Sequence, residues 1–302
     1  MDFFTLPIED WVEAAVDFAL DHFQPALNVV ETIVLIVTGA VGAVLSVLPP
    51  PLLLIVIVLL SLWRCGLGFG IFTLVALLLT AGMGVWPQMV DTLGLVLGSA
   101  ILSLILGVPL GIWMARSAKA RAVLKTILDF MQTMPAFVYL IPAVIFFGLG
   151  KVPGTLATVI FAMPPAVRLT ALGIQQVPSE IVEAGKAFGC TSRQLLFKVQ
   201  LPNALPSIMA GVNQTIMLAL SMVVIASMIG AGGLGNVVLS GIQRLDVGLG
   251  FKGGLAVVFL AIILDRITQS FGEGARRPAA GQLGGLRRFL PAPAASSSPS
   301  QP

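Results

Sequence analysis

Charged residues are scarce in this sequence. Only 10% of its 302 residues are charged and 57% are hydrophobic, whereas a soluble domain carries about 25% charged residues. So little charge, together with several long apolar runs, excludes a soluble globular domain and predicts an integral membrane protein. The small net charge of +3 gives no indication of a nucleic-acid-binding surface.

Histidine and cysteine are nearly absent as well. The single histidine, His22, has no second histidine or cysteine beside it, so we expect no metal site. Cys65 and Cys190 are far apart in the chain, and two free thiols are expected rather than a disulfide. One remote histidine cannot form a Ser-His-Asp triad, and no paired acids face each other within a predicted span. We therefore predict that the chain has no catalytic residues and is not an enzyme.

Two glycine-rich stretches resemble nucleotide-binding motifs but have the wrong surroundings. Gly230, Gly232 and Gly235 satisfy G-x-G-x-x-G, yet the apolar run before them is too long for a strand and Asp246 follows too soon. In "FGLGKVPGT", Val152 stands where a P-loop needs serine or threonine to bind magnesium. We expect that this chain binds no cofactor.

Seven segments are long and apolar enough to cross a bilayer. A spanning helix needs about 20 mostly apolar residues. The predicted spans are residues 49–64, 67–86, 91–115, 132–150, 154–171, 205–229 and 252–271. The fold class expected from them is an all-α polytopic membrane protein with about seven transmembrane helices.

The basic residues indicate the orientation in the membrane, because lysine and arginine near helix ends resist translocation. If the loop "RSAKARAVLK" is cytoplasmic, fourteen of the seventeen basic residues lie inside. Only Lys151, Arg244 and Lys252 then lie outside, which predicts a cytoplasmic C-terminus. The first 63 residues contain seven acids and no lysine or arginine, which suits an extracytoplasmic N-terminus.

The two ends of the chain differ from its centre. Residues 1–48 are expected to form an amphipathic, interfacial region. Within it, residues 27–48 are long enough to span, but Glu31, several glycines and a following triple proline favour a helix in the outer interface. Residues 49–86 would be peripheral transmembrane helices, and residues 87–272 the core. Residues 273–302 are rich in Pro, Ala, Gly and Ser, and we expect a disordered cytoplasmic tail.

A cytoplasmic loop at residues 176–206 carries the strongest signal. Ser179 can cap a helix, Gly189 can supply the left-handed turn that stops it, and the pair Thr191 and Gln194 fits a capping box for a second short helix that Pro202 ends. The predicted product is a helix-turn-helix elbow in the cytoplasm. Its apolar face has no lipid to cover it and therefore needs a protein partner.

The sequence "EAGKAFGCTSRQLLFKVQLP" in this loop resembles the E-A-A loop of ABC importer membrane subunits. Glu183, Ala184, Gly189, Leu201 and Pro202 stand at the spacing of that motif. Two positions depart from it by conservative changes, Gly185 for alanine and Val199 for isoleucine. The resemblance implies a type I ABC importer transmembrane fold and a coupling helix. It also implies that Glu183, Ala184, Gly185 and Gly189 contact a separate ATP-binding subunit, which holds ATP and magnesium.

A second resemblance extends over residues 91–270. Stretches such as "LGVPLGIWMARS", "MQTMPAFVYLIP" and "FAMPPAVRLT" are similar to the glycine betaine/L-proline permeases of osmoprotectant importers. This implies a permease in the bacterial inner membrane that carries glycine betaine, proline betaine or a related compatible solute inward by alternating access. The implied partners are the ATP-binding subunit, an extracytoplasmic substrate-binding protein and a second copy of the chain. "IGAGGLG" then corresponds to an extracytoplasmic turn, in which glycines allow a tight re-entrant bend: Gly230, Gly232, Gly233 and Gly235.

Polar residues within the predicted spans are few, and each is a helix contact or part of a substrate path. The candidates for the path are Gln132, Thr133, Tyr139, Asn213, Gln214, Thr215 and Ser221. A packing role for them remains open. The alternative function is a self-contained secondary transporter or channel, which would need an ion-coupling charge in the membrane. The predicted spans have almost no such charge.

Overall fold

The computed structural model describes residues 8–274, and within that range the chain forms helices and turns without a strand. The elements in chain order are α1 (Ile8–Val47), α2 (Pro50–Cys65), α3 (Leu67–Gly82), α4 (Trp86–Arg116), α5 (Ala118–Thr133), the 3-10 turn η1 (Ala136–Tyr139), α6 (Leu140–Phe147), α7 (Lys151–Gln175), α8 (Ser179–Ala187), α9 (Ser192–Gln194), the π-helical turn η2 (Leu195–Gln200), α10 (Leu201–Ser227), α11 (Gly233–Gln243) and α12 (Val247–Gly274). The predicted all-α class is confirmed. The predicted tail falls almost entirely outside the described residues.

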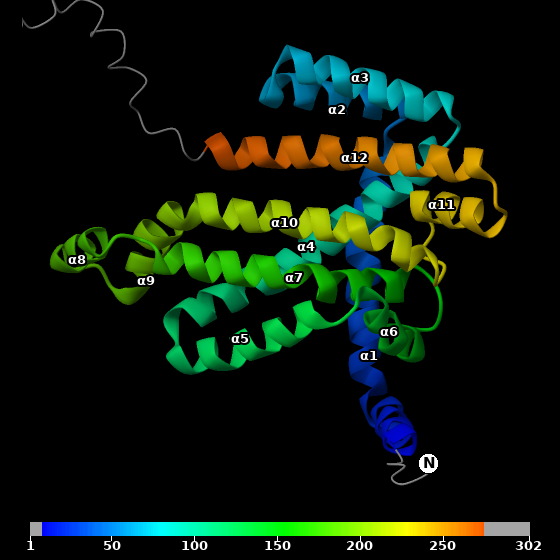
Figure 1. Ribbon diagram of the computed structural model, residues 1–302. Coiled ribbons are helices and arrows are strands. Elements are labelled where there is room, and N and C mark those ends of the chain that lie inside the picture. The colour runs from blue at the N-terminus through cyan, green and yellow to red at the C-terminus, as the bar shows by residue number, and fades with distance from the viewer. Residues whose placement is uncertain (1–7, 275–302) are drawn as a thin grey trace, which may run out of the picture.

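The core of the molecule is the packing of α7 against α4 and α10 (Figure 1). Glycines make this packing close, because a side chain at their positions would meet the neighbouring helix. A Cβ at Gly111 of α4 would lie 2.7 Å from the Val167 carbonyl oxygen, and one at Gly211 of α10 would lie 3.3 Å from the Pro165 carbonyl oxygen. Small residues allow helix backbones to approach in this way inside membranes.

Within residues 8–274, five helices are long and apolar enough to cross a membrane. They contain the segments Val16–Val47, Trp86–Arg116, Lys151–Gln175, Ser192–Ser227 and Val247–Gly272. The predicted spans at 49–64 and 67–86 correspond to α2 and α3, which are apolar but have only 16 residues each. These two helices form a hairpin on the outside of α12 (Figure 1).

The span predicted at residues 132–150 is not one continuous helix. The chain forms α5 through the supposed cytoplasmic loop, breaks at Met134 and continues through η1 into the eight-residue α6, with a bend of 109° between the two parts. Pro135 is the physical cause, because the residue before a proline is driven out of the helical region. Met134 accordingly has extended dihedral angles. The pair counts as one broken span or a re-entrant segment, which raises the number of possible crossings to six.

The N-terminal region is one helix, α1, rather than separate amphipathic pieces. It runs without a break through Pro25 and is long and apolar enough to span. It crosses α4 and α7 steeply instead of lying alongside α10 and α12 (Figure 1). Contact with α4 is made at Gly94 and Gly98, where a Cβ would approach Leu45 and Thr38. The interfacial position predicted for residues 27–48 stays a prediction.

The two ends of the bundle carry different groups. One end holds α8 and α9 and also the α2–α3 turn, whose Arg64 donates a hydrogen bond to the Ser270 carbonyl near the end of α12 (Figure 1). The other end holds α6 and α11, and there the Gly150 N–H donates to the Ile229 carbonyl. Lys151, one of the few basic residues predicted outside, lies at this second end and pairs with Asp91 at 3.3 Å. Among the described residues, Arg64 and Lys151 thus lie at opposite ends of the bundle.

Candidate functional site

The elbow begins with α8, whose first residue is Ser179. The predicted cap by its side chain is wrong, because Pro178 occupies the capping position and no side chain caps the helix. A proline is tolerated at this position because the N–H group that it lacks would have no acceptor within the helix. Glu180 lies in the first turn and Lys186 in the last, and both charges are favourable for the helix dipole.

Gly189 ends α8, as predicted. Its φ is +77°, a left-handed conformation that costs most residues about 1–2 kcal/mol and glycine very little. The Cys190 N–H donates to the Gly185 carbonyl at 3.1 Å and the Gly189 N–H donates to the Lys186 carbonyl at 2.9 Å. This is a Schellman motif, which satisfies carbonyls left free at the helix end. The turn between the two helices of the elbow therefore has a defined backbone geometry.

The predicted capping box after this turn is also confirmed. The Gln194 N–H donates to the Thr191 hydroxyl at 3.3 Å, and the Thr191 N–H donates to the Gln194 side-chain oxygen at 2.9 Å. Each side chain thus satisfies a backbone donor at the start of α9.

The prediction that Pro202 ends the second helix is wrong. The chain stays helical from α9 through η2 into α10, and Pro202 lies in the first turn of α10. Within a regular helix a proline ring collides with the carbonyl four residues earlier. Here the turn is widened, and the Leu201 N–H donates to Leu196, five residues back. The π-helical turn accommodates the proline and joins the elbow directly to α10.

The face of α8 that points away from the bundle is open. Within Ser179–Ala187 no residue is buried, and Glu183 and Ala184 are exposed. Phe188, directly after the helix, is 90% exposed. Behind α8 lies a cavity of about 410 Å³ lined by Glu183, Lys186 and Arg116 of α4. An exposed aromatic side chain at the end of a short projecting helix is the kind of surface that a partner protein covers.

Gly185 lies on the inner side of α8, toward η2. A Cβ at this position would lie 2.8 Å from the Leu195 Cδ1 atom and 3.6 Å from the Val199 Cγ2 atom. The two departures from the expected motif, Gly185 and Val199, therefore lie in one contact. This contact, which also includes Leu195, packs α8 against η2 at the start of α10. The sequence could identify the changes but not this contact.

At the opposite end, the glycine-rich stretch forms the tight turn that was predicted. Gly230, Gly232 and Gly233 all have positive φ, between 73° and 84°. A Cβ at Gly233 would lie 2.5 Å from the Thr92 hydroxyl, which accepts a 2.7 Å hydrogen bond from the Leu234 N–H. Gly235 lies in α11 against the Val223 carbonyl of α10. The turn thus brings α11 back against α10 and α4.

The structure divides the candidate path residues into two groups. Exposed positions are occupied by Gln132, Thr133, Gln214 and Ser221. Tyr139 is buried and donates a hydrogen bond to the Met131 carbonyl, and Thr215 is fully buried. These two side chains do not face an open route in this structure.

Asn213 belongs to a polar cluster between α10 and α12. Its amide donates to Asp265 at 2.9 Å and its oxygen accepts from the Thr268 hydroxyl. Gln269 also donates to both carboxylate oxygens of Asp265 at 2.8 Å. The cluster ties two helices together, so the structure favours the packing role for Asn213.

A second ion pair, like that of Lys151 and Asp91, was not predicted. Arg168 of α7 donates to Asp129 of α5 at 2.6 Å, with both side chains partly exposed. The sequence analysis assigned Asp129 no place, because it lies between the loop "RSAKARAVLK" and the span predicted at 132–150. The available signal was the amphipathic pattern of residues 118–133, in which Leu124 and Leu128 face the bundle.

The family model for "Binding-protein-dependent transport system inner membrane component" matches residues 107–277. This range contains the elbow, the glycine-rich turn and α10.

Curated relatives are similar over most of the chain. The glycine betaine/proline betaine transport system permease protein ProW of Escherichia coli (strain K12) is 51% identical over 90% of this chain and 77% of its own length. The glycine betaine/carnitine transport permease protein GbuB of Listeria monocytogenes serotype 1/2a (strain 10403S) is 52% identical over 90% of this chain and 98% of its own length. Among solved structures, the MetNI methionine ABC transporter in an inward-facing conformation matches with a TM-score of 0.58 and 20% identity, over 62% of this chain and 94% of that chain.

Proposed function

The chain belongs to the family of binding-protein-dependent transport system inner membrane components, and from that premise we propose that it carries glycine betaine, proline betaine or a related compatible solute. It is the permease subunit of an ABC importer and not an enzyme, with the type I importer transmembrane fold. Its partners are an ATP-binding subunit and a substrate-binding protein.

The observation that supports the proposed cargo is the high identity, over nine-tenths of the chain, to two permeases named for glycine betaine transport. Recognition of the quaternary ammonium group itself belongs to the substrate-binding protein in this proposal. Such recognition uses a cage of several aromatic rings, and this chain has a single tyrosine.

The elbow couples ATP hydrolysis to transport. Glu183, Ala184 and the exposed Phe188 contact the ATP-binding subunit, which holds ATP and magnesium, while this chain binds no cofactor. Two copies of the permease form the pore. Closure of the ATP-binding subunits moves the two elbows together and turns the pore from one side of the membrane to the other. The direct helical connection from the elbow through η2 into α10 supports this route, because it passes displacement to a core helix without a flexible joint.

The proposal includes an orientation in the membrane. The elbow and the C-terminus are cytoplasmic, and the turn at Gly230, Gly232, Gly233 and Gly235 is extracytoplasmic. The N-terminus is also extracytoplasmic, with α1 in or near the outer interface. Supporting this are the absence of lysine and arginine from the first 63 residues and the steep crossing of α4 by α1 (Figure 1).

The test is purification of this chain from native membranes in a mild detergent, followed by uptake of labelled glycine betaine into vesicles that contain the recovered complex. We expect a P-loop ATPase to co-purify and uptake to require both ATP and the binding protein. ATP-dependent uptake of an unrelated solute alone would overturn the proposed cargo. Uptake of glycine betaine by this chain without an ATPase would instead identify a self-contained transporter.

A further inference from the structure

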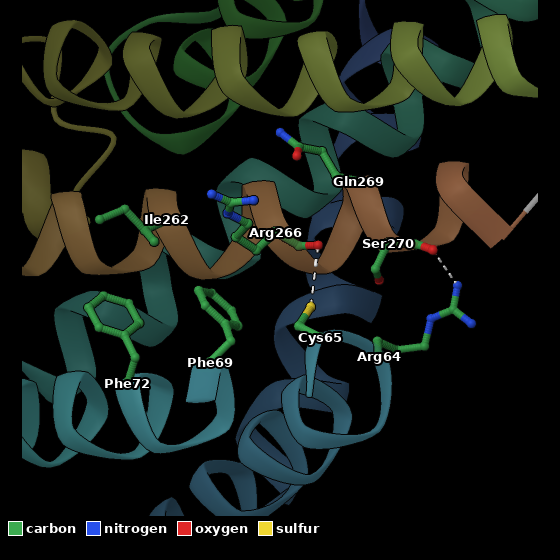
Figure 2. Close-up of a pocket in the computed structure, with 8 residues that line it drawn as sticks. All are labelled: Arg64, Cys65, Phe69, Phe72, Ile262, Arg266, Gln269 and Ser270. Carbon is green, nitrogen blue, oxygen red and sulfur yellow. Dashed lines mark hydrogen bonds between the residues drawn. The ribbon is translucent and has the colours of Figure 1, made fainter. Parts of the chain in front are cut away.

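A cavity of about 480 Å³ opens where the α2–α3 turn meets α12 (Figure 2). Phe69 and Phe72 of α3 and Ile262 of α12 form an apolar wall. Arg64 and Arg266 line the same cavity, and Figure 2 shows Arg64 reaching toward Ser270 while Arg266 projects from the middle of this stretch of α12. The cavity thus combines two cations with an apolar surface.

In the proposed orientation, on which this inference rests, the cavity lies at the cytoplasmic boundary of the bilayer. The α2–α3 hairpin exposes large apolar side chains along its length, including Leu59, Ile71 and Leu78, each more than half exposed, as expected for helices in contact with lipid. Trp63, 76% exposed, directly precedes Arg64 at the end of α2. Tryptophan and arginine at a helix end are typical of the interface between hydrocarbon and water.

Among the side chains that the structure describes, no acid pairs with the two arginines of this cavity. Arg64 donates to the Ser270 carbonyl at 2.8 Å and stacks 4.1 Å from the Phe271 ring, but its buried Nε atom has no hydrogen-bond partner. The Arg266 side chain forms no hydrogen bond or ion pair with the side chains that the structure describes. Neighbouring Asp265 is bound by Asn213 and Gln269 and accepts nothing from Arg266.

We propose that this cavity binds an anionic phospholipid of the inner leaflet. The phosphate lies at Arg266, Arg64 adds positive charge at the end of the cavity, and an acyl chain lies against Phe69, Phe72 and Ile262. A soluble anion would use the arginines but not the apolar wall, whereas a phospholipid uses both. Basic pockets between membrane helices on the cytoplasmic side bind the headgroups of anionic lipids. The lipid would add to the direct contacts that the α2–α3 hairpin makes with α12.

Native mass spectrometry of the purified complex tests this proposal. Phosphatidylglycerol and phosphatidylcholine with identical acyl chains are titrated onto delipidated protein, with and without inorganic phosphate in excess. We expect Arg266→Gln to weaken phosphatidylglycerol binding about fivefold, since a basic residue near the surface contributes about 1 kcal/mol. Phosphatidylcholine, whose choline cation offsets the charge of its own phosphate, should lose less affinity than phosphatidylglycerol. Lys125→Gln, an exposed cation on α5 outside the cavity, is the matched control and should bind both lipids as the unmodified protein does.

Three results would overturn the proposal. They are unchanged phosphatidylglycerol binding by Arg266→Gln, an equal loss in Lys125→Gln, and displacement of the lipid by inorganic phosphate, which would indicate a site for a soluble anion. Arg64→Gln could disturb the contact with Ser270, so Arg266→Gln, at an exposed position, decides the outcome. Phe72→Ala should weaken both lipids equally because it removes part of the acyl-chain surface. The readout does not involve transport and is independent of the proposed cargo.

Discussion

Individual glycines in this permease are required for two different reasons. At Gly189 the backbone is left-handed and a Cβ would meet nothing within 4 Å, so the requirement for glycine comes from the backbone alone. At Gly111 the dihedral angles are ordinary, and the requirement comes from the 2.7 Å approach to α7. The same residue type therefore serves two different physical purposes, and substitutions can distinguish them.

Replacement of Gly189 by valine should disrupt the elbow, whereas replacement by asparagine should preserve it. Valine is strained in the left-handed region by about 1–2 kcal/mol, while asparagine visits it readily. We expect Gly189→Val to lower affinity for the ATP-binding subunit about tenfold, which corresponds to 1.4 kcal/mol. The measurement is titration of the purified ATPase onto detergent-solubilised permease. Equal binding by both variants would show that the turn is not needed for the contact.

Between elements, the polar cluster of α10 and α12 is the main specific tie. Apolar contacts between membrane helices gain no hydrophobic driving force, because lipid chains are as apolar as the side chains. Asn213, Asp265, Thr268 and Gln269 instead satisfy one another across the helix pair. The cluster defines the rotation and depth at which α12 packs on α10.

Asp265→Leu should destabilise the permease because it leaves the Asn213 and Gln269 amides without an acceptor. An unsatisfied buried polar group costs about 1–3 kcal/mol. A lower melting temperature in detergent is expected, and Thr126→Ala on the exposed face of α5 should leave it unchanged. The double variant Asn213→Leu/Asp265→Leu should recover part of the loss, since removing both partners leaves fewer unpaired groups. A double variant less stable than Asp265→Leu would contradict this account.

At the scale of the whole molecule, the fold separates two chemically different ends. The elbow, the α2–α3 turn and the end of α4 share one end, with most of the basic residues, while α6, α11 and the glycine-rich turn share the other (Figure 1). The positions of Phe188 and Leu245, 90% and 89% exposed, make them convenient reporters of the two ends.

Cysteine labelling with a membrane-impermeant reagent should locate these ends. In a background of Cys65→Ser and Cys190→Ser, Leu245→Cys is expected to react in intact spheroplasts and Phe188→Cys only after the membrane is opened. Phe18→Cys on α1, 57% exposed in the unmodified protein, should react from outside if the N-terminus is extracytoplasmic. Labelling of Phe18→Cys only from inside would show that α1 crosses the bilayer. Reversal of the other two would overturn the orientation.

Much of this protein could be predicted from local sequence patterns. Hydropathy indicated the membrane class and the approximate positions of α4, α7, α10 and α12, because the length of an apolar run is a property of the chain itself. The Gly189 turn and the Thr191–Gln194 capping box were predictable for the same reason, since their partners lie within five residues.

The tertiary structure decided the features that depend on distant residues. Asn213 finds its acceptor 52 positions away in Asp265, and Arg168 finds Asp129 39 positions away. The widened turn before Pro202 and the bend after α5 are local, but the sequence could not choose between ending a helix and accommodating a proline. That choice depends on whether neighbouring helices stabilise the distorted backbone, and this packing exists only in the folded molecule.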